Sequence, residues 1–221
     1  MSEILKQLSV CIERGKVNQA SPYPPDMQGG KGADELTQLA LETGISPSDV
    51  LNQALMLGMK NIGDKFEAGE AFIPDMLIAA KAMNTAMVHL QPHFDSGEVK
   101  LKGTFIIGTV SGDLHDIGKN IVSMILTGSG WNVIDLGVDV SSEKFVKTVG
   151  ENPGSIVGMS ALLTTTMMQM SSINQAIKGK YPDTKVFVGG APLSQKYSDE
   201  IGTDGYFPDP NKFSKYLDAI D

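Results

Sequence analysis

The stretch TFIIGTVSGDLHDIG, residues 104–118, decides the fold of the C-terminal half of the chain. Its first part, residues 104–110, is an apolar run rich in β-branched side chains, which predicts a buried strand. The loop 111–118 follows, where two glycines permit tight backbone turns, and a helix is expected to begin near Ile117. A buried strand that leads through such a loop into a helix is the opening of a βαβ unit.

The same rhythm continues toward the C-terminus. Short apolar runs stand at residues 131–137, 155–160 and 185–190, and helical stretches separate them. A final short strand is expected near residues 205–207. Strands that are apolar on both faces and alternate with helices predict a parallel sheet covered on two sides, with right-handed crossovers. We therefore expect an α/β, Rossmann-like (flavodoxin-like) domain with a five-stranded parallel sheet over residues 103–221.

The N-terminal half, residues 1–90, has a helical period instead. Ser46 stands as a helix N-cap before Pro47, and Pro74 opens another helix. These signals predict four helices, which form a bundle-like cap domain. The stretch 21–32 between the first two helices is rich in proline and glycine, so we expect a mobile loop there.

Residues 91–102 are interpreted as a linker, because Pro92, Gly97 and several charges interrupt both patterns. The chain of 221 residues is 41% hydrophobic, enough for a packed core of ordinary size. Its formal net charge is −8, and no block of lysine and arginine stands out. Since phosphate binding needs such clusters, no nucleic-acid partner is expected.

Cys11 is the single cysteine of the chain, which excludes an intramolecular disulfide and a thiolate metal cluster. The N-terminal residues lack the basic start and continuous apolar run of a signal peptide, and no later segment approaches the length that crosses a bilayer. We therefore expect a cytoplasmic protein without a membrane partner.

The loop 111–118 also carries the candidate chemistry, because ligands of a doubly wound sheet bind at the carboxyl ends of its strands. His115 is a candidate metal ligand. Asp113 is placed to accept a hydrogen bond from the other ring nitrogen, which would fix the tautomer and raise the basicity of the ligand. Alone, such a pair is more often solvated or part of a cap, and Asp116 fits a helix N-cap equally well.

Two downstream segments make the pattern specific, because they continue it at the ends of the third and fourth expected strands. The three motifs are D-x-H-x-x-G, S-x-L and a Gly-Gly pair, filled here by Asp113, His115, Gly118, Ser160, Leu162, Gly189 and Gly190. In type and spacing they resemble the cobalamin-binding domain shared by B12-dependent methionine synthases, methyltransferase corrinoid proteins and B12-dependent mutases.

The resemblance implies a site for cobalamin, whose own base leaves the cobalt while its nucleotide tail threads into a slot beside the sheet. His115 would take the vacated lower axial position on the cobalt, and Asp113 and His115 form the catalytic pair. The residues implied to contact the cofactor in this domain are Gly112, Asp113, Leu114, His115, Asp116, Ile117, Gly118, Ser160, Leu162, Thr164, Thr166, Gly189 and Gly190.

Within this set, Ser160 and Leu162 would line the tail slot, and the two glycines would let the backbone approach the tail closely. Thr164 is expected to contact the corrin edge, and Thr166 to extend a relay from His115 and Asp113 toward solvent. For each threonine the alternative is a helix cap.

The resemblance extends to the helical half, which in methionine synthases and corrinoid proteins covers the methyl-bearing face of the corrin. The matching run is residues 65–76, where Phe66, Ile73 and Met76 are the candidates that shield the methyl–cobalt bond. The alternative is an ordinary core role, which is the more common one for aromatic and methionine side chains at helical spacing.

A helical cap joined to a cobalamin domain resembles a methyltransferase cognate corrinoid protein. The implied role is a methyl carrier that binds cobalamin base-off and His-on and cycles between Co(I) and methyl-Co(III) (methylcobalamin). It would be the methyl-carrying subunit of a corrinoid-dependent methyltransferase system and not a complete enzyme. The implied partners are a substrate:corrinoid methyltransferase, a corrinoid:folate or corrinoid:thiol methyltransferase, and a reductive activase.

Two other readings are open. One is a B12-dependent sensor or regulatory protein, for which a basic helix-turn-helix would be expected in place of the acidic helical half. The other is a cofactor-free receiver domain, in which Asp113 and Asp116 would form an acidic cluster. His115 and the two spaced downstream motifs favour cobalamin binding over the receiver.

Overall fold

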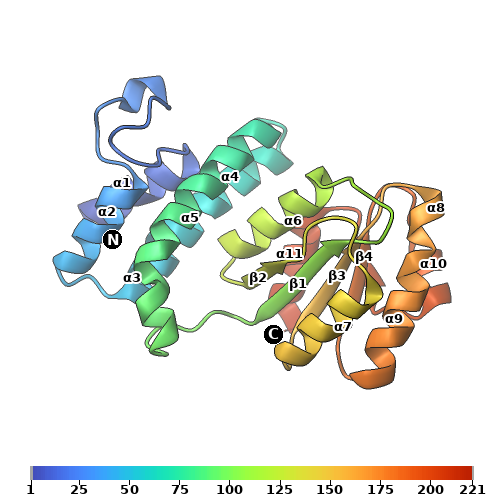
Figure 1. Ribbon diagram of the computed structural model, residues 1–221. Helices are drawn as coiled ribbons and strands as arrows, with labels where there is room; N and C mark the ends of the chain where they lie inside the picture. The colour runs from blue at the N-terminus through green and yellow to red at the C-terminus, as the bar shows by residue number, and fades with distance from the viewer. Residues whose placement is uncertain (1, 221) are drawn as a thin grey trace. The chain divides into compact units, whose positions relative to one another are not determined.

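The structure is a computed structural model that describes residues 2–220 (Figure 1). The chain forms two compact units, Met1–Leu101 with Gly128–Gly130, and Lys102–Thr127 with Trp131–Asp221. They are called the helical unit and the α/β unit below. Within residues 2–220, no helix combines the length and the apolar character that crossing a membrane requires.

The helical unit contains four main helices within residues 2–101, as the sequence predicts. The first two are α1 (Glu3–Glu13) and α2 (Ala33–Glu42), and the last is α5 (Ile73–Asp95). The third is one continuous run of α3 (Pro47–Val50), the π-helical segment η2 (Leu51–Leu55) and α4 (Met56–Glu67). Its start is the predicted one, because the Ser46 hydroxyl accepts a hydrogen bond of 3.0 Å from the Asp49 amide.

Two segments of the helical unit differ from the simple sequence pattern. Helix α5 passes through Pro92 and ends at Asp95, inside the range expected to be a linker. Pro92 lies in the last turn, so its missing N–H removes one hydrogen bond without ending the helix at once. The proline- and glycine-rich stretch 21–32 contains the short helix η1 (Pro25–Met27), and Arg14 donates hydrogen bonds of 2.6 and 2.7 Å to Asp26 there.

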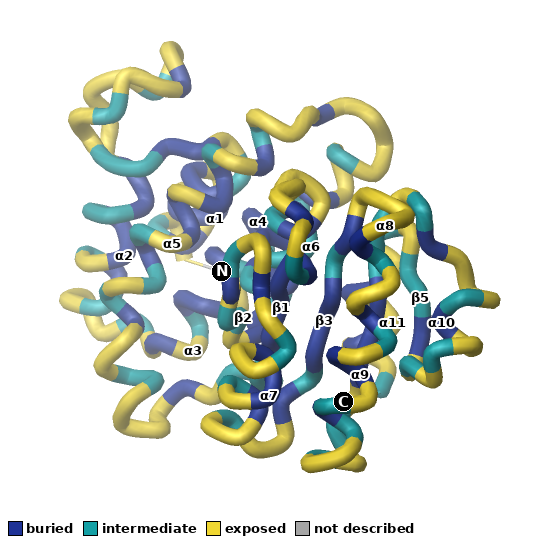
Figure 2. The backbone as a smooth tube through the Cα atoms, turned by 45° about the vertical axis from the view of Figure 1, so that its right-hand side comes forward, coloured by how far each residue is buried: buried dark blue, intermediate teal, exposed yellow. Residues whose placement is uncertain are grey.

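The core of the helical unit lies between its helices, where the tube in Figure 2 is dark blue. Leu8 and Ile12 of α1, Leu55 of η2, and Met76 and Leu90 of α5 are fully buried. These positions follow the helical period of the sequence, so the amphipathic faces of the helices meet in one core.

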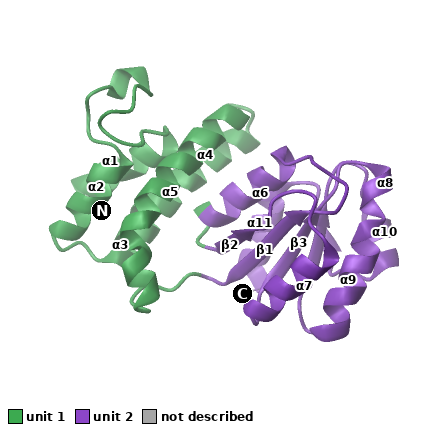
Figure 3. Cartoon of the chain, in the orientation of Figure 1, with its two compact units in different colours: residues 1–101, 128–130 green, residues 102–127, 131–221 purple. Residues whose placement is uncertain are grey.

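The α/β unit, purple in Figure 3, contains a parallel sheet with the strand order β2-β1-β3-β4-β5. The strands are β1 (Thr104–Thr109), β2 (Asn132–Asp135), β3 (Ile156–Ser160), β4 (Val186–Gly189) and β5 (Gly205–Tyr206). The helices of the unit are α6 (Ile117–Gly128), α7 (Ser142–Glu151), α8 (Thr164–Met167), α9 (Gln169–Lys180), α10 (Gln195–Ile201) and α11 (Pro210–Ile220). The expected five-stranded α/β fold is confirmed.

Buried clusters lie on both faces of this sheet, as a doubly wound fold requires. One cluster joins Phe145 of α7 and Ile173 of α9 to the strands. The other joins Leu126 of α6 and Phe213 of α11 to Phe105 of β1. The strand order reverses between β1 and β3, and the carboxyl ends of the strands on either side of such a point are where ligands of this fold bind.

Candidate functional site at the carboxyl edge of the sheet

The three sequence motifs emerge from neighbouring strands at one edge of the sheet. Thr109, the last residue of β1, pairs with Ser160 of β3, and Ser160 pairs with Gly189 of β4. Because the strands are parallel and in register, the loops that follow them begin side by side. The register therefore places the loop that carries His115 beside Ser160 and Gly189, the motif residues at the ends of β3 and β4.

The loop between β1 and α6 is held in shape by hydrogen bonds to its own backbone. Thr109 is buried, and its hydroxyl donates to the His115 carbonyl at 2.9 Å. The Asp113 amide donates to the Val110 carbonyl at 3.1 Å. Gly112 has a φ of +81°, a left-handed conformation that side chains disfavour. The loop thus turns sharply before it presents His115.

The Asp113 carboxylate lies fully buried at the centre of a hydrogen-bond network. Its Oδ1 lies 2.7 Å from Nδ1 of His115 and also accepts a 3.0 Å bond from the His115 amide. Its Oδ2 accepts a bond of 2.7 Å from the Thr166 hydroxyl and one of 2.8 Å from the Leu162 amide. The pair expected from the sequence and its proposed extension through Thr166 therefore come together in the structure.

Burial by itself raises the pKa of Asp113. The hydrogen bonds from Thr166, from the Leu162 amide and from His115 outweigh that effect and hold the pKa well below its usual range. Asp113 is therefore an anion at neutral pH, and an anionic carboxylate can only accept hydrogen bonds. It follows that Nδ1 of His115 carries the proton and that the lone pair of the neutral ring lies on Nε2.

The His115 side chain is 51% exposed, although its carboxylate partner is fully buried. No group of residues 2–220 makes a hydrogen bond to its Nε2. Nor do these residues contain a cluster of three or more histidine, cysteine or acidic side chains that could hold a metal ion. A metal at Nε2 would therefore need most of its ligands from another molecule.

All three histidines have a carboxylate within hydrogen-bond distance, which shows why such a pair alone is weak evidence. The pairs are His89 with Asp34, His93 with Glu98, and His115 with Asp113. The carboxylates differ in burial, since the Asp34 and Glu98 side chains are 41% and 55% exposed while Asp113 is inaccessible. Only a buried partner, closed off from water by further donors, fixes the imidazole in one orientation.

A cavity of about 630 Å³ opens beside His115 within the α/β unit. Phe105, Phe187 and Phe213 contribute to its apolar wall, and α6 contributes Lys119 and Val122. The sequence-predicted residues that line it are Leu114, His115, Asp116, Ile117, Gly118, Ser160, Leu162, Gly189 and Gly190. This cavity is called the slot below.

The remaining predicted residues of the α/β unit do not line the slot. Gly112 turns the loop, and Asp113 and Thr166 lie behind His115 in the network. Thr164 is exposed at the start of α8. Asp116, which does line the slot, also contacts the first turn of α6: its carboxylate accepts a 3.1 Å bond from the Asn120 side chain, and its carbonyl accepts a bond from the Asn120 amide.

The two glycines of the third motif have different structural roles. A Cβ atom on Gly190 would lie 1.8 Å from the Ala161 carbonyl oxygen, and the φ of Gly190 is +138°. Gly190 therefore lets two loops pack together. A Cβ on Gly189 would meet its nearest neighbour, the Phe207 carbonyl oxygen, at 3.5 Å, an ordinary contact. Gly189 therefore keeps the slot open without being required by the fold.

Sequence reasoning missed the aromatic walls and Lys119. The apolar pattern of a strand does not separate residues facing a slot from residues facing a core, so Phe105 and Phe187 carry no distinguishing signal. Lys119 is 3% exposed, and its ammonium group contacts Asp135 and, at 2.6 Å, the side chain of Asn120. A buried lysine of this kind is recognisable only once its partners are known.

The three cap candidates belong to the helical unit and differ in exposure. Met76 is fully buried, Phe66 is half-buried and Ile73 is 36% exposed. Phe72 and Leu77, which sequence reasoning did not select, are 67% and 49% exposed. The start of α5 therefore presents apolar side chains at its surface, with Met76 packed beneath them.

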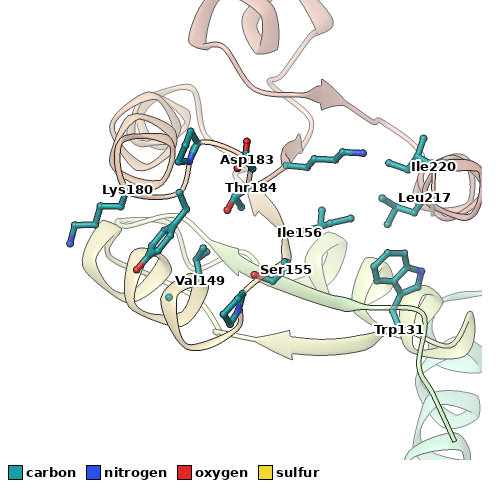
Figure 4. Close-up of a pocket in the computed structure, with 15 residues that line it drawn as sticks. Trp131, Val149, Ser155, Ile156, Lys180, Asp183, Thr184, Leu217 and Ile220 are labelled. Atoms are coloured by element: carbon teal, nitrogen blue, oxygen red, sulfur yellow. The ribbon is translucent and has the colours of Figure 1, made fainter. Parts of the chain in front are cut away.

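A second cavity, of about 520 Å³, lies at the opposite edge of the sheet (Figure 4). Trp131, Ser155 and Ile156 line it, together with Lys180 and Leu217. Its lining contains none of the motif residues. The indole N–H of Trp131 and the hydroxyl of Ser155 are buried there and have no hydrogen-bond partner among residues 2–220.

The corrinoid implied by the sequence fits the donors at the carboxyl edge. His115 offers a single nitrogen lone pair on a ring held from behind, which suits a metal whose other ligands come from a macrocycle. The slot beside it is walled by aromatic rings and passes two glycine positions, which suits a long tail that ends in an aromatic base.

Comparisons with known proteins agree with this fit. Two protein-family models match the chain, both described as a B12 binding domain, one at residues 30–91 and the other at residues 103–212. The chain is 41% identical over 178 residues to trimethylamine corrinoid protein 1 of Methanosarcina acetivorans, covering 79% of this chain and 82% of that protein. It is 42% identical over 180 residues to monomethylamine corrinoid protein 2 of the same organism, covering 78% of this chain and 82% of that protein.

Solved structures are similar over nearly the whole chain. The methanol:cobalamin methyltransferase complex of Methanosarcina barkeri matches with a TM-score of 0.84 and 29% identity, covering 99% of this chain and 80% of that chain. A cobalamin-binding protein of Desulfitobacterium hafniense DCB-2 matches with a TM-score of 0.67 and 26% identity, covering 97% of each chain. Both the sequence motifs and these relatives lead to one family: the chain belongs to the methyltransferase cognate corrinoid proteins, with a B12 binding domain in each of its two units.

Proposed function

We propose that this chain is a corrinoid methyl carrier, which binds cobalamin with its base off and with His115 as the lower axial ligand. The observation that supports this best is the half-exposed His115 ring, whose Nε2 has no hydrogen bond among residues 2–220 while its Nδ1 is fixed by the buried Asp113. Cobalamin bound there would supply a cobalt that takes up and releases the methyl group.

In this proposal Asp113 and His115 act as one unit. The buried carboxylate accepts the Nδ1–H bond, which increases the electron density on Nε2 and so strengthens it as a ligand. The hydroxyl of Thr166 and the amide of Leu162 hold the carboxylate in place from the other side. Loss of the hydrogen bond from Thr166 to Asp113 would change the negative charge that the carboxylate presents to Nδ1 of His115. Thr166 would take part in the relay in this way.

The slot would receive the nucleotide tail. Its aromatic walls, including Phe105, Phe187 and Phe213, would exclude water from one side of the tail, and Ser160, which also lines the slot, would offer a hydroxyl. Gly118 and Gly189 leave room for the tail because neither carries a side chain. Thr164, exposed at the start of α8, would contact the corrin edge.

The helical unit would shield the methyl-bearing face. Ile73 has the exposure for direct contact, and the half-buried Phe66 can contribute an edge of its ring. Met76 would act from beneath, by filling the core under the first turn of α5. Apolar contacts of this kind exclude water from a reactive metal–carbon bond.

The names of the relatives support the first of the proposed partners, a substrate:corrinoid methyltransferase. Two relatives are named for trimethylamine and monomethylamine, and one similar structure is a complex of a methanol:cobalamin methyltransferase. We therefore propose that a substrate:corrinoid methyltransferase delivers the methyl group from a small methylated compound. A corrinoid:folate or corrinoid:thiol methyltransferase would remove it, and a reductive activase would restore the carrier after oxidation.

Replacing His115 tests the ligand assignment. In the cobalamin-loaded protein, His115→Ala should keep the cofactor in the slot but remove the visible absorption spectrum of imidazole-bound cobalamin. His93→Ala is a matched control, since Nδ1 of His93 also lies 2.6 Å from a carboxylate, that of Glu98. An H115A spectrum identical to that of the unaltered protein would rule out His115 as the ligand.

A methyl-transfer assay separates a carrier from a sensor. The reduced, cobalamin-loaded protein is incubated with candidate methylated amines, methanol, methoxylated aromatics or betaines and the methyltransferase encoded beside its gene. Methylation of the cofactor should appear with one donor class and should be reversed by a folate- or thiol-dependent methyltransferase. If the protein binds cobalamin but the cofactor is methylated under none of these conditions, the carrier function is contradicted.

A further inference from the structure

Asp139 is the one non-glycine residue with a positive φ within residues 2–220, at +52°. It follows β2, in the connection to α7, and its side chain is exposed. The left-handed conformation is unfavourable for residues with a Cβ, although aspartate and asparagine tolerate it better than most. Such an outlier persists where surrounding contacts impose it, and it is common near functional sites.

The contacts that impose this conformation all reach the loop that carries His115. Oδ1 of Asp139 accepts a 2.7 Å hydrogen bond from the Gly112 amide and a 3.2 Å bond from the Ser111 hydroxyl. The Asp139 amide donates to the Asp113 carbonyl at 3.0 Å. One residue of the neighbouring loop therefore binds three consecutive residues, 111–113, with both its side chain and its backbone.

These bonds continue the pairing of the two strand ends. The Val140 amide donates to the Thr109 carbonyl at 2.9 Å, and the Thr109 amide donates to the Gly137 carbonyl at 3.0 Å. The backbone of Asp113 is thus anchored by Asp139, while its carboxylate is anchored by Thr166 and Leu162. With both ends of Asp113 fixed, its Oδ1 has one position from which to hold Nδ1 of His115.

We propose that Asp139 is a positioning residue for His115, because it holds residues 111–113 so that Asp113 orients the imidazole and Nε2 faces the cofactor. This inference rests on the proposed function, since it concerns how His115 is presented to a metal. It adds a residue from a second loop, outside the three sequence motifs, to those that set the ligand geometry.

Three substitutions separate the carboxylate from the backbone conformation. Asp139→Asn keeps an oxygen acceptor and tolerates the left-handed φ. Asp139→Gly accepts this φ freely but removes the acceptor, and Asp139→Ala removes the acceptor and adds strain. Asp183→Ala, an exposed aspartate just before β4 at the opposite edge of the sheet, is the matched control.

The measurement is the ratio of His-on to His-off cobalamin in the visible spectrum, at equal amounts of bound cofactor. In D139A and D139G we expect this ratio to fall about fivefold, the effect of losing about 1 kcal/mol of hydrogen bonding. D139N and D183A should keep the ratio of the unaltered protein. A second readout needs no cofactor: hydrogen exchange at the Gly112 amide should accelerate in D139A and D139G but not in D139N.

Each outcome decides the matter. An unchanged ratio in both D139A and D139G, with a changed spectrum in H115A, would overturn the role of Asp139 and leave the proposed function intact. A fall in D139A that D139G does not share would also overturn it, because backbone strain and not the carboxylate would then be responsible. If H115A itself leaves the spectrum unchanged, the proposed function fails first and the inference falls with it.

Discussion

The two edges of one sheet carry cavities of similar volume, about 630 Å³ at the carboxyl edge and about 520 Å³ at the amino edge. At the carboxyl edge, buried Asp113 is hydrogen-bonded on both of its oxygens, while the ring beside it keeps Nε2 available. At the amino edge, the buried polar atoms of Trp131 and Ser155 have no hydrogen-bond partner within the part of the chain that the structure describes.

The difference shows that volume does not define a site. A ligand site needs a group that is held firmly and still has bonding capacity toward the open space, as His115 has. A buried polar atom without a partner is a cost to the folded state unless a ligand can reach it. Each prediction below substitutes a residue at one edge of the sheet. The reference is either a substitution at the other edge or the stability of the cofactor-free protein.

The largest effect is expected for Asp113→Asn. The new side chain has the same shape, but its amide group can accept on one side only, so either His115 or the Leu162 amide and Thr166 hydroxyl would face another donor. We expect a loss of about 3 kcal/mol in the free energy of unfolding of the cofactor-free protein, measured by urea denaturation.

Asp183→Asn is the reference for this change at the amino edge. Asp183 is exposed, so its substitution should alter the free energy of unfolding by no more than about 0.5 kcal/mol. Equal effects of D113N and D183N would show that the network around Asp113 is not a distinct, strongly coupled structure.

The sequence predicted the α/β fold well because its signals are local and repeated. The strands at residues 104–109 and 156–160 are apolar on both faces, and the glycine-containing loop before Ile117 marks the turn into a helix. His115 and Asp113 could be selected from the loop after the first strand, and Thr166 from the resemblance to the cobalamin-binding domain. The parallel register then places the loops that carry them at one edge of the sheet.

Other features depend on packing that no local pattern reveals. The need for glycine at 190 arises from the Ala161 carbonyl on a different loop, and the burial of Met76 depends on which face of α5 meets the other helices. Asp139 escaped notice because an aspartate after a strand is an ordinary turn residue. Its hydrogen bonds to residues 111–113 exist only once β1 and β2 pair.

A smaller effect of opposite sign is expected for Gly118→Ala. Gly118 lies in the first turn of α6 and lines the slot, and a Cβ there would meet no atom within 4 Å. Alanine should stabilise the cofactor-free protein by about 0.5–1 kcal/mol, because glycine is a poor helix residue. The same methyl group would occupy slot volume and weaken cobalamin binding.

Thermal unfolding of the empty protein and titration with cobalamin measure these two quantities separately. If Gly118 had no part in cobalamin binding, G118A would gain stability without losing affinity for cobalamin. If G118A binds cobalamin as tightly as the unaltered protein, the tail does not pass this part of α6.

The smallest effect is expected for Ser155→Ala at the amino edge. Its hydroxyl is buried and has no hydrogen-bond partner among the described residues, so its removal breaks no hydrogen bond seen there. The free energy of unfolding should change by no more than about 0.5 kcal/mol, on the stabilising side. Cobalamin affinity and the His-on spectrum should not change. If S155A instead lowers the free energy of unfolding by about 1 kcal/mol or more, the Ser155 hydroxyl forms a hydrogen bond in solution. The buried polar groups of the two edges would then both be hydrogen-bonded, and this difference between the edges would disappear.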